Sequence, residues 1–393
     1  MANPDVKDYP SSPGQRKLGS LLATELRELG LKDVEQDERG LVWATIPGRV
    51  ENCPVVALNS HVDTSPETSG ANVRPQVIEN YQGGDLTLPG DPQQVIRVAE
   101  NPELNSLQGC TLITTDGTTL LGADDKAGLA IIVETAATLL ANTHIAHGPI
   151  RVLFTCDEEI GHGVDHVDLN KLAADVCYTL DGPAANNIDV ETFSADGAEI
   201  KIRGINIHPA IAKDRMVNAV RAAAEFVARL PRDTLAPEST FDRQGFLHPY
   251  QVSGGIECVD IRVLLRDFDT DKLDDQAALL ERIRREVLGL FPGLTIDMTI
   301  KQQYRNLSDG LAGDPRTVEY AEEAHRRLGR TPERHIIRGG TDGSRLTELG
   351  LPTPNLSSGQ HNPHSPLEWA CLDEMAAAVE VLIELVQVWA EKR

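Results

Sequence analysis

Hydrophobic residues recur at helix and strand spacings through the first half of the chain. Leu18, Leu22, Leu26 and Leu29 follow helical spacing, and Gly30 can end that helix. Another helix is predicted over residues 129–140. Short apolar runs predict buried strands at residues 41–46, 55–59, 111–115, 150–155 and 176–180. This alternation, which extends to about residue 190, predicts an α/β domain with a largely parallel sheet.

The pattern changes after this first region. Strands and amphipathic helices alternate over about a hundred residues, which is typical of an α+β domain of ferredoxin-like type. These elements are strands at 199–202, 259–268 and 294–300 and helices at 216–230 and 271–288. Helices at 318–328 and 372–390, and a tight loop at 338–343 leading into a short helix, then resume the first domain. We therefore predict a discontinuous domain of residues 1–191 and 306–393, with residues 192–305 inserted into it.

Two stretches follow neither periodicity. Residues 1–13 are polar and contain prolines, which predicts a poorly ordered terminus. Residues 64–110 contain several prolines and the pair Gly83-Gly84. A loop of this length is uncommon inside a compact domain and is usually either functional or wrongly assigned.

Composition excludes several partners. The 393 residues carry a net charge of −23, which would repel nucleic acid and anionic membranes. No apolar stretch is long enough to span a bilayer. The six cysteines are scattered and form no C-x-x-C pair, so they resemble small buried residues of a protein in the reducing cytoplasm. We expect neither a disulfide framework nor a thiolate metal site.

Acidic residues and histidines follow several of the predicted strands. These residues are His61, Asp124, the run Asp157-Glu158-Glu159, and Asp181. Taken singly, each is also explained by a turn, a hydrogen-bonded loop residue or a helix start. In α/β sheets, however, ligand sites gather at the carboxyl ends of the strands. Nitrogen and oxygen donors without cysteine suit two divalent ions of the zinc, manganese or cobalt kind.

The sequence resembles the peptidase T family of cocatalytic dinuclear zinc peptidases, from about Gly14 to the C-terminus. Part of the resemblance lies in residues 72–85, inside the stretch that lacks periodicity. The other motifs are His61-Val-Asp63-Thr-Ser-Pro, Leu-Leu-Gly-Ala-Asp124-Asp-Lys-Ala-Gly, Asp157-Glu-Glu, Asn206-x-His208-Pro, Arg266-Asp-Phe-Asp and Arg338-Gly-Gly-Thr-Asp-Gly. His-x-Asp alone is common, whereas the ordered set is specific.

The resemblance implies a zinc-peptidase-like α/β/α catalytic domain with an inserted ferredoxin-like α+β lid domain. It also implies an aminopeptidase that releases the N-terminal residue from unblocked tripeptides. Two metal ions would be held by His61 and Asp181, by Glu159 and His364, and by Asp124, which would bridge them. Asp63 would orient the His61 ring, and Glu158 would be the general base. A cis peptide bond would follow Asp124.

Four further residues are implied to bind the substrate. His208 would help to stabilise the oxyanion, and Arg266 and Arg338 would bind a substrate carboxylate. Asn306 is a candidate for the same pocket. Without the resemblance, His208 is better explained as a turn residue before Pro209, and the two arginines could be surface ion-pair partners.

Alternatives remain at four points: the C-terminal ligand, the activity, the metal and the oligomeric state. Both His361 and His364 could be the C-terminal ligand, and the family spacing to Glu368 favours His364. The chain could instead be a related amidohydrolase or dipeptidase acting on N-acyl amino acids or dipeptides. The resemblance implies that Asp181 at its ligand position favours an aminopeptidase or dipeptidase over a deacylase. A non-catalytic metal-dependent binding protein is a third possibility. Zinc is the expected metal, with cobalt or manganese as alternatives. Small peptides are the expected partners, and the chain is expected to be a monomer or homodimer.

Overall fold

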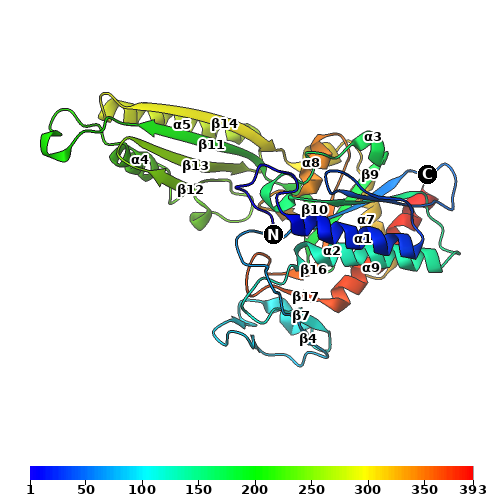
Figure 1. The fold of residues 1–393 in the computed structure, drawn as a ribbon. Helices are drawn as coiled ribbons and strands as arrows, with labels where there is room; N and C mark the ends of the chain where they lie inside the picture. Colours follow the sequence, from blue (N-terminus) through cyan, green and yellow to red (C-terminus); the bar gives the residue numbers. More distant parts are fainter. Residues whose placement is uncertain (393) are drawn as a thin grey trace. The chain divides into compact units, whose positions relative to one another are not determined.

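The computed structural model describes residues 1–392, which divide into two compact units (Figure 1). Unit 1 comprises Met1–Val190, Leu307–His335 and Thr341–Arg393, and unit 2 comprises Glu191–Asn306 and Ile336–Gly340. The sequence pattern did not indicate that the short segment Ile336–Gly340 belongs with the inserted region. No helix in residues 1–392 is both long and apolar enough to cross a membrane.

Unit 1 contains an 11-stranded mixed sheet. Its centre is parallel and consists of β8 (Ile150–Thr155), β3 (Val56–His61), β9 (Val176–Pro183) and β16 (Asn355–His361). Antiparallel strands flank this centre: β2 (Val42–Ile46) and β1 (Lys32–Gln36) on one side, and β17 (Trp369–Cys371), β7 (Leu112–Thr114) and β4 (Gln76–Ile78) on the other. β10 (Asn187–Thr192) pairs with β16 and with β15 (Glu333–Ile337). The sheet is therefore parallel only at its centre.

Helices cover both faces of this sheet, because its central strands are apolar on both sides. Alternate residues of β2 enter different cores: Val42, Ala44 and Ile46 pack into one, and Trp43 packs into the other. The first core also contains residues of α1 (Pro13–Leu29), α2 (Ala123–Ala141), α7 (Arg316–Arg327) and α9 (Leu372–Glu391), and Figure 1 shows α1, α2 and α9 side by side. The second contains residues of α3 (Leu169–Leu172) and α8 (Asp342–Glu348). This layering confirms the predicted α/β/α architecture.

Residues 64–110 form a small ordered subdomain of unit 1. They contain β4, β5 (Leu86–Thr87), β6 (Val95–Ile96) and the 3-10 helix η1 (Pro102–Ser106). Strands of two or three residues are too short to produce a visible alternation, which explains why no periodicity was found. A subsidiary core holds them in place: Tyr81, Leu88, Ile96, Leu104, Leu107, Leu112, Trp369 and Cys371.

The prediction that residues 1–13 are poorly ordered is wrong. Ala2 and Ser11 are buried, and the Ala2 N–H donates to the Thr64 carbonyl oxygen at 2.9 Å. The Tyr9 hydroxyl donates to the Cys156 carbonyl oxygen at 3.0 Å. Tertiary hydrogen bonds therefore fix a segment whose composition is typical of a loose end.

Unit 2 has the predicted ferredoxin-like fold. Its order is β11 (Ser194–Arg203), α4 (Ala219–Ala228), β12 (Phe246–Gly254), β13 (Cys258–Asp267), α5 (Asp271–Leu290) and β14 (Thr295–Tyr304). The antiparallel sheet runs β12-β13-β11-β14, and α4 and α5 contact each other and the same strands. Short helices complete the two units: η2 (Glu158–Ile160), η3 (Pro209–Ile211), η4 (Pro237–Ser239) and α6 (Leu307–Leu311).

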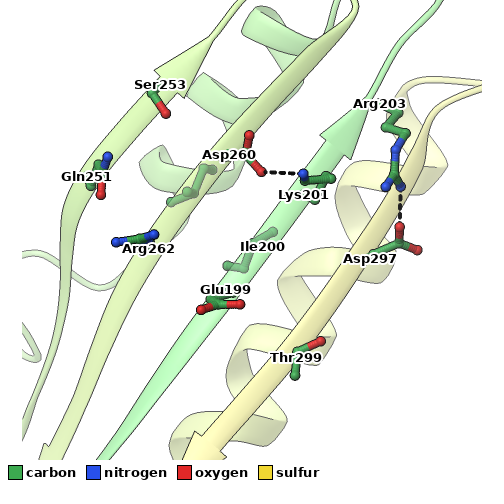
Figure 2. A pocket seen from close by; sticks show the side chains of 11 residues that line it. Glu199, Ile200, Lys201, Arg203, Gln251, Ser253, Asp260, Arg262, Asp297 and Thr299 are labelled. Carbon is green, nitrogen blue, oxygen red and sulfur yellow. Dashed lines mark hydrogen bonds and ion pairs between the residues drawn. The ribbon is translucent and has the colours of Figure 1, made fainter. Parts of the chain in front are cut away.

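The face of the unit 2 sheet opposite its helices is hollowed (Figure 2). Glu199, Lys201 and Arg203 of β11 line it, alternating with residues of the unit 2 core. Lys201 Nζ lies 3.1 Å from Asp260 Oδ1, and Arg203 pairs with Asp297. Because opposite charges neutralise each other across neighbouring strands, we do not consider this hollow a catalytic candidate.

Candidate metal centre

The carboxyl ends of three adjacent strands in unit 1 position most of the candidate site. β3 pairs in parallel with both β8 and β9, so residues at their ends are neighbours in space. His61 ends β3, Glu158 and Glu159 lie in the turn after β8, and Asp181 lies in β9. Asp124 lies at the start of α2, and His364 lies between β16 and β17.

These side chains form two groups of three that share Asp124. Oδ1 of Asp124 lies 3.0 Å from His61 Nε2, and its Oδ2 lies 3.2 Å from His364 Nε2. Asp181 Oδ1 is 4.0 Å from His61 Nε2, and Glu159 Oε2 is 2.8 Å from His364 Nε2. In each triad, one ligand atom per residue lies within 4.8 Å of the others. Each oxygen of Asp124 thus faces a different triad, as a bridging carboxylate requires.

The electrostatics of this cluster fit two bound cations. Burial raises the pKa values of Asp181 and Glu159, and the nearby Asp124 carboxylate raises them further. Buried carboxylates at such short range are costly unless opposite charge compensates them. Within residues 1–392, Glu159 Oε1 is buried without a hydrogen-bond partner. Nitrogen and oxygen donors without sulfur suit zinc, cobalt or manganese.

Asp63 connects one imidazole ring to the glutamate turn. Its Oδ1 lies 3.4 Å from His61 Nδ1, the position from which a carboxylate orients a ligand ring. Its two oxygens also accept the backbone N–H groups of Glu158, at 3.2 Å, and Glu159, at 3.1 Å. The second connection was not expected from the sequence. One buried carboxylate therefore positions the candidate ligand His61 and both glutamates.

The two adjacent glutamates have different surroundings. Glu159 belongs to one triad, whereas Glu158 belongs to neither and has its Oε2 4.0 Å from His61 Nε2. Burial raises the pKa of Glu158, and the nearby Asp342 carboxylate adds to the rise. A half-buried carboxylate beside a candidate metal centre, with a raised pKa, has the properties of a proton acceptor.

Several residues that support the site were missed in the sequence. Glu368 accepts hydrogen bonds from the backbone N–H groups of Leu121, Gly122 and Asp124, at 2.7, 2.8 and 3.0 Å. These bonds fix the backbone that leads into Asp124. Gln360 Nε2 donates to Asp181 Oδ1 at 3.0 Å. The only signal available was the family spacing between His364 and Glu368.

Asp125 supports His61 from the other side. Its Oδ2 accepts the Ser60 hydroxyl at 2.5 Å and the His61 N–H at 3.2 Å. The peptide bond between Asp124 and Asp125 is cis, as the resemblance implied. A side chain at Gly128 would approach the Leu180 carbonyl oxygen at 2.3 Å, so glycine is required where α2 packs against β9.

Asp157, which had no expected task, anchors the glutamate turn to the N-terminal segment. Its Oδ2 accepts the Ser11 N–H at 2.6 Å, and its Oδ1 accepts Gln15 Nε2 at 2.5 Å. The Asp157 N–H donates in return to Gln15 Oε1 at 2.9 Å. With φ of 60°, Asp157 has the left-handed backbone that aspartate and asparagine tolerate. The N-terminal segment, which the sequence predicts to be poorly ordered, therefore helps to hold the turn that carries Glu158.

We expect Asp157→Asn to lower kcat by about 10- to 100-fold, the usual effect of losing a hydrogen-bonded support of a metal site. Asparagine tolerates the same left-handed backbone as aspartate, but its side-chain NH₂ group would face the hydrogen-bond donors of Ser11 or Gln15. Leaving buried donors unpaired should also reduce the free energy of unfolding by about 1–3 kcal/mol. Kinetics and urea unfolding measure both effects. Asp33→Asn is the matched control, because Asp33 is exposed and has φ of 52°; equal effects in both variants would contradict the anchoring role.

The structure separates the two C-terminal histidines. His364 joins the triad of Asp124 and Glu159. His361 Nε2 instead lies 2.7 Å from Glu374 Oε2, and its ring stacks on Trp369 with centroids 3.8 Å apart. Its geometry is that of a packed core histidine.

The four predicted substrate residues all lie in unit 2. His208 is exposed, and its Nδ1 accepts the Ala210 N–H at 3.2 Å. Arg266 donates to the carbonyl oxygens of Asp196 and Leu265, at 3.1 and 2.9 Å.

The other two make structural contacts within the same unit. Arg338 donates to the carbonyl oxygens of Asp242 and Gln244, at 2.7 and 2.8 Å. Asn306 donates to the Phe268 carbonyl oxygen at 2.9 Å. Binding of substrate by these four residues stays a prediction.

Sequence comparison identifies close relatives. Residues 115–388 match the model of peptidase family M20/M25/M40. The chain is 40% identical to a peptidase T of Bacillus pumilus (strain SAFR-032), over 100% of this chain and 96% of the relative. It is 41% identical to a peptidase T of Clostridium perfringens (strain ATCC 13124), over 98% and 94%.

Solved structures share the fold. The aminopeptidase PepT of Bacillus cereus ATCC 10987 matches with a TM-score of 0.76 at 24% identity, over 98% of this chain and 96% of that chain. A tripeptidase of Staphylococcus aureus subsp. aureus mu50 matches with a TM-score of 0.78 at 24% identity, over 99% and 96%.

Proposed function

This chain belongs to peptidase family M20/M25/M40, and we propose that it is a metal-dependent aminopeptidase that releases the N-terminal residue from unblocked tripeptides. The observation that carries the proposal is the pair of triads sharing Asp124, with Glu158 beside them. Full-length identity of 40% to a peptidase T relative supports the substrate class.

Five residues would hold two divalent cations. His61 and Asp181 would bind one, Glu159 and His364 the other, and Asp124 both, in keeping with the triads. We propose zinc, which nitrogen and oxygen ligands in this combination accommodate. When bound, the two cations polarise the scissile carbonyl group and lower the pKa of water.

Glu158 would move the proton. Its carboxylate accepts a proton from the attacking water and donates it to the nitrogen of the departing amine. Glu159 cannot do this while it serves as a ligand. Asp63 and Asp157 keep Glu158 in place through the backbone of its turn.

Turnover of a tripeptide compared with its N-acetylated form tests the substrate class. We expect the free tripeptide to be cleaved with a kcat/KM at least about 100-fold higher, because a site that binds a charged amine leaves buried groups unpaired when that amine is blocked. A dipeptide with a free N-terminus is the size control. Preference for the acetylated peptide would instead favour an amidohydrolase acting on N-acyl substrates.

We also propose a cytoplasmic location. Six free cysteines are in keeping with a reducing compartment.

A further inference from the structure

Two of the cysteines that the sequence scatters along the chain meet in unit 1. Cys110 ends the 64–110 segment, and Cys371 ends β17 directly before α9. Antiparallel pairing of β7 with β17 sets Cys371 opposite Leu112, and the Leu372 N–H donates to the Thr111 carbonyl oxygen at 2.9 Å. This register brings the Cys110 thiol beside the Cys371 thiol.

A carboxylate completes the group. Asp373 Oδ2 accepts the Thr111 N–H at 2.8 Å, which ties Asp373 to the same strand end. The sulfur atoms of Cys110 and Cys371 and an oxygen of Asp373 all lie within 4.8 Å of one another. Cys371 is buried, Cys110 is half-buried and Asp373 is exposed. The group is therefore open on one side, where an ion could enter with a water ligand.

The donor chemistry differs from that of the main metal centre. Burial raises the pKa of both thiols, that of Cys371 to about 12, so both are protonated without a cation. A bound soft cation deprotonates its thiol ligands, which here releases two protons to solvent. Two thiolates select thiophilic metals, whereas the Asp124 centre has only nitrogen and oxygen donors.

We propose that Cys110, Cys371 and Asp373 form a third metal site, which takes a thiophilic divalent cation such as zinc or cadmium. Its role is structural. The ion joins the last residue of the 64–110 segment to the start of α9, at the edge of the subsidiary core that contains Cys371 and Trp369. The proposal departs from the expectation that the cysteines form no thiolate site. A disulfide would use the same two sulfurs but not the nearby Asp373 carboxylate, which already accepts the Thr111 N–H.

Cadmium is the probe that separates this site from the main centre. The holoenzyme, freshly reduced and desalted under argon, is titrated with CdCl₂ while the ultraviolet thiolate-to-cadmium charge-transfer band is followed. We expect a band that saturates at about one cadmium ion per chain, because the main centre contains no thiolate. Cys110→Ser should remove it, and Asp373→Asn should weaken cadmium binding about tenfold or more. Cys53→Ser is the matched control, because Cys53 is half-buried outside the group.

A second measurement covers the case in which a cysteine variant does not fold. Alkylation of the unmutated holoenzyme by iodoacetamide, quantified by mass spectrometry, should slow about tenfold at Cys110 when cadmium is bound, and not at Cys53. No charge-transfer band in the unmutated chain, an equal band in Cys110→Ser, or equal alkylation rates with and without cadmium would overturn the proposal.

Discussion

Glu158→Gln is expected to lower kcat by about 100- to 10,000-fold while the chain binds as much zinc as before. The amide has nearly the same size as the carboxylate but cannot accept a proton from water at neutral pH. Zinc binding should persist because Glu158 lies outside both triads. KM should change little, since the substitution removes an interaction of the transition state.

The measurement pairs steady-state kinetics on a tripeptide with metal analysis of the same preparation. Glu28→Gln is the control, because Glu28 is exposed on α1. Full activity in Glu158→Gln would rule out the general-base role. Loss of zinc together with activity would show that Glu158 is a ligand, which would contradict the division between the two glutamates.

Asp124→Asn is expected to have the second large effect, which is loss of both ions of the centre. Each oxygen of Asp124 faces one triad, so losing its charge weakens both ligand sets. Loss of an outer hydrogen-bond partner alone reduces metal affinity about 10- to 100-fold, and loss of a shared ligand should exceed that. Zinc content should therefore fall by about two ions per chain, and activity should fall with it.

His364→Ala provides the comparison, because His364 belongs to one triad only. Its zinc content should fall by about one ion per chain under the same conditions. Both variants are measured at a free zinc concentration that saturates the unmutated chain. An Asp124→Asn chain that loses no more zinc than His364→Ala would contradict the bridging role.

Much of the centre could be located from the sequence because its residues follow recognisable strands. His61 and the Asp157-Glu158-Glu159 run come directly after buried apolar runs, and parallel strands end at the same edge of a sheet. Asp124 and Asp181 were candidates for the same reason, and the family resemblance then added His364. The family spacing to Glu368 favoured His364 over His361, and the structure adds the physical reason, because the ring of His361 stacks on Trp369.

The supporting contacts could not be predicted because they are small groups of hydrogen bonds between residues distant in sequence. Asp157 contacts Ser11 of the N-terminal segment and Gln15 of α1, and Glu368 contacts the backbone that leads into Asp124. Such contacts leave no periodicity. The same reason explains why the sequence predicts that residues 1–13 are poorly ordered.

The contact between two of the cysteines could not be predicted from the sequence either. Cys110 and Cys371 come together only through the pairing of β7 with β17. Strands of three residues are too short for a hydrophobic pattern to predict such a pairing. A tertiary group made this way becomes visible only in the structure.

Anomalous diffraction at the zinc edge, from crystals of the zinc-loaded chain, tests the central claim most directly. The account predicts one peak in the triad of His61, Asp124 and Asp181 and a second in the triad of Asp124, Glu159 and His364, with Asp124 between them. A single peak at this edge of the sheet, or two peaks that do not share Asp124, would contradict it.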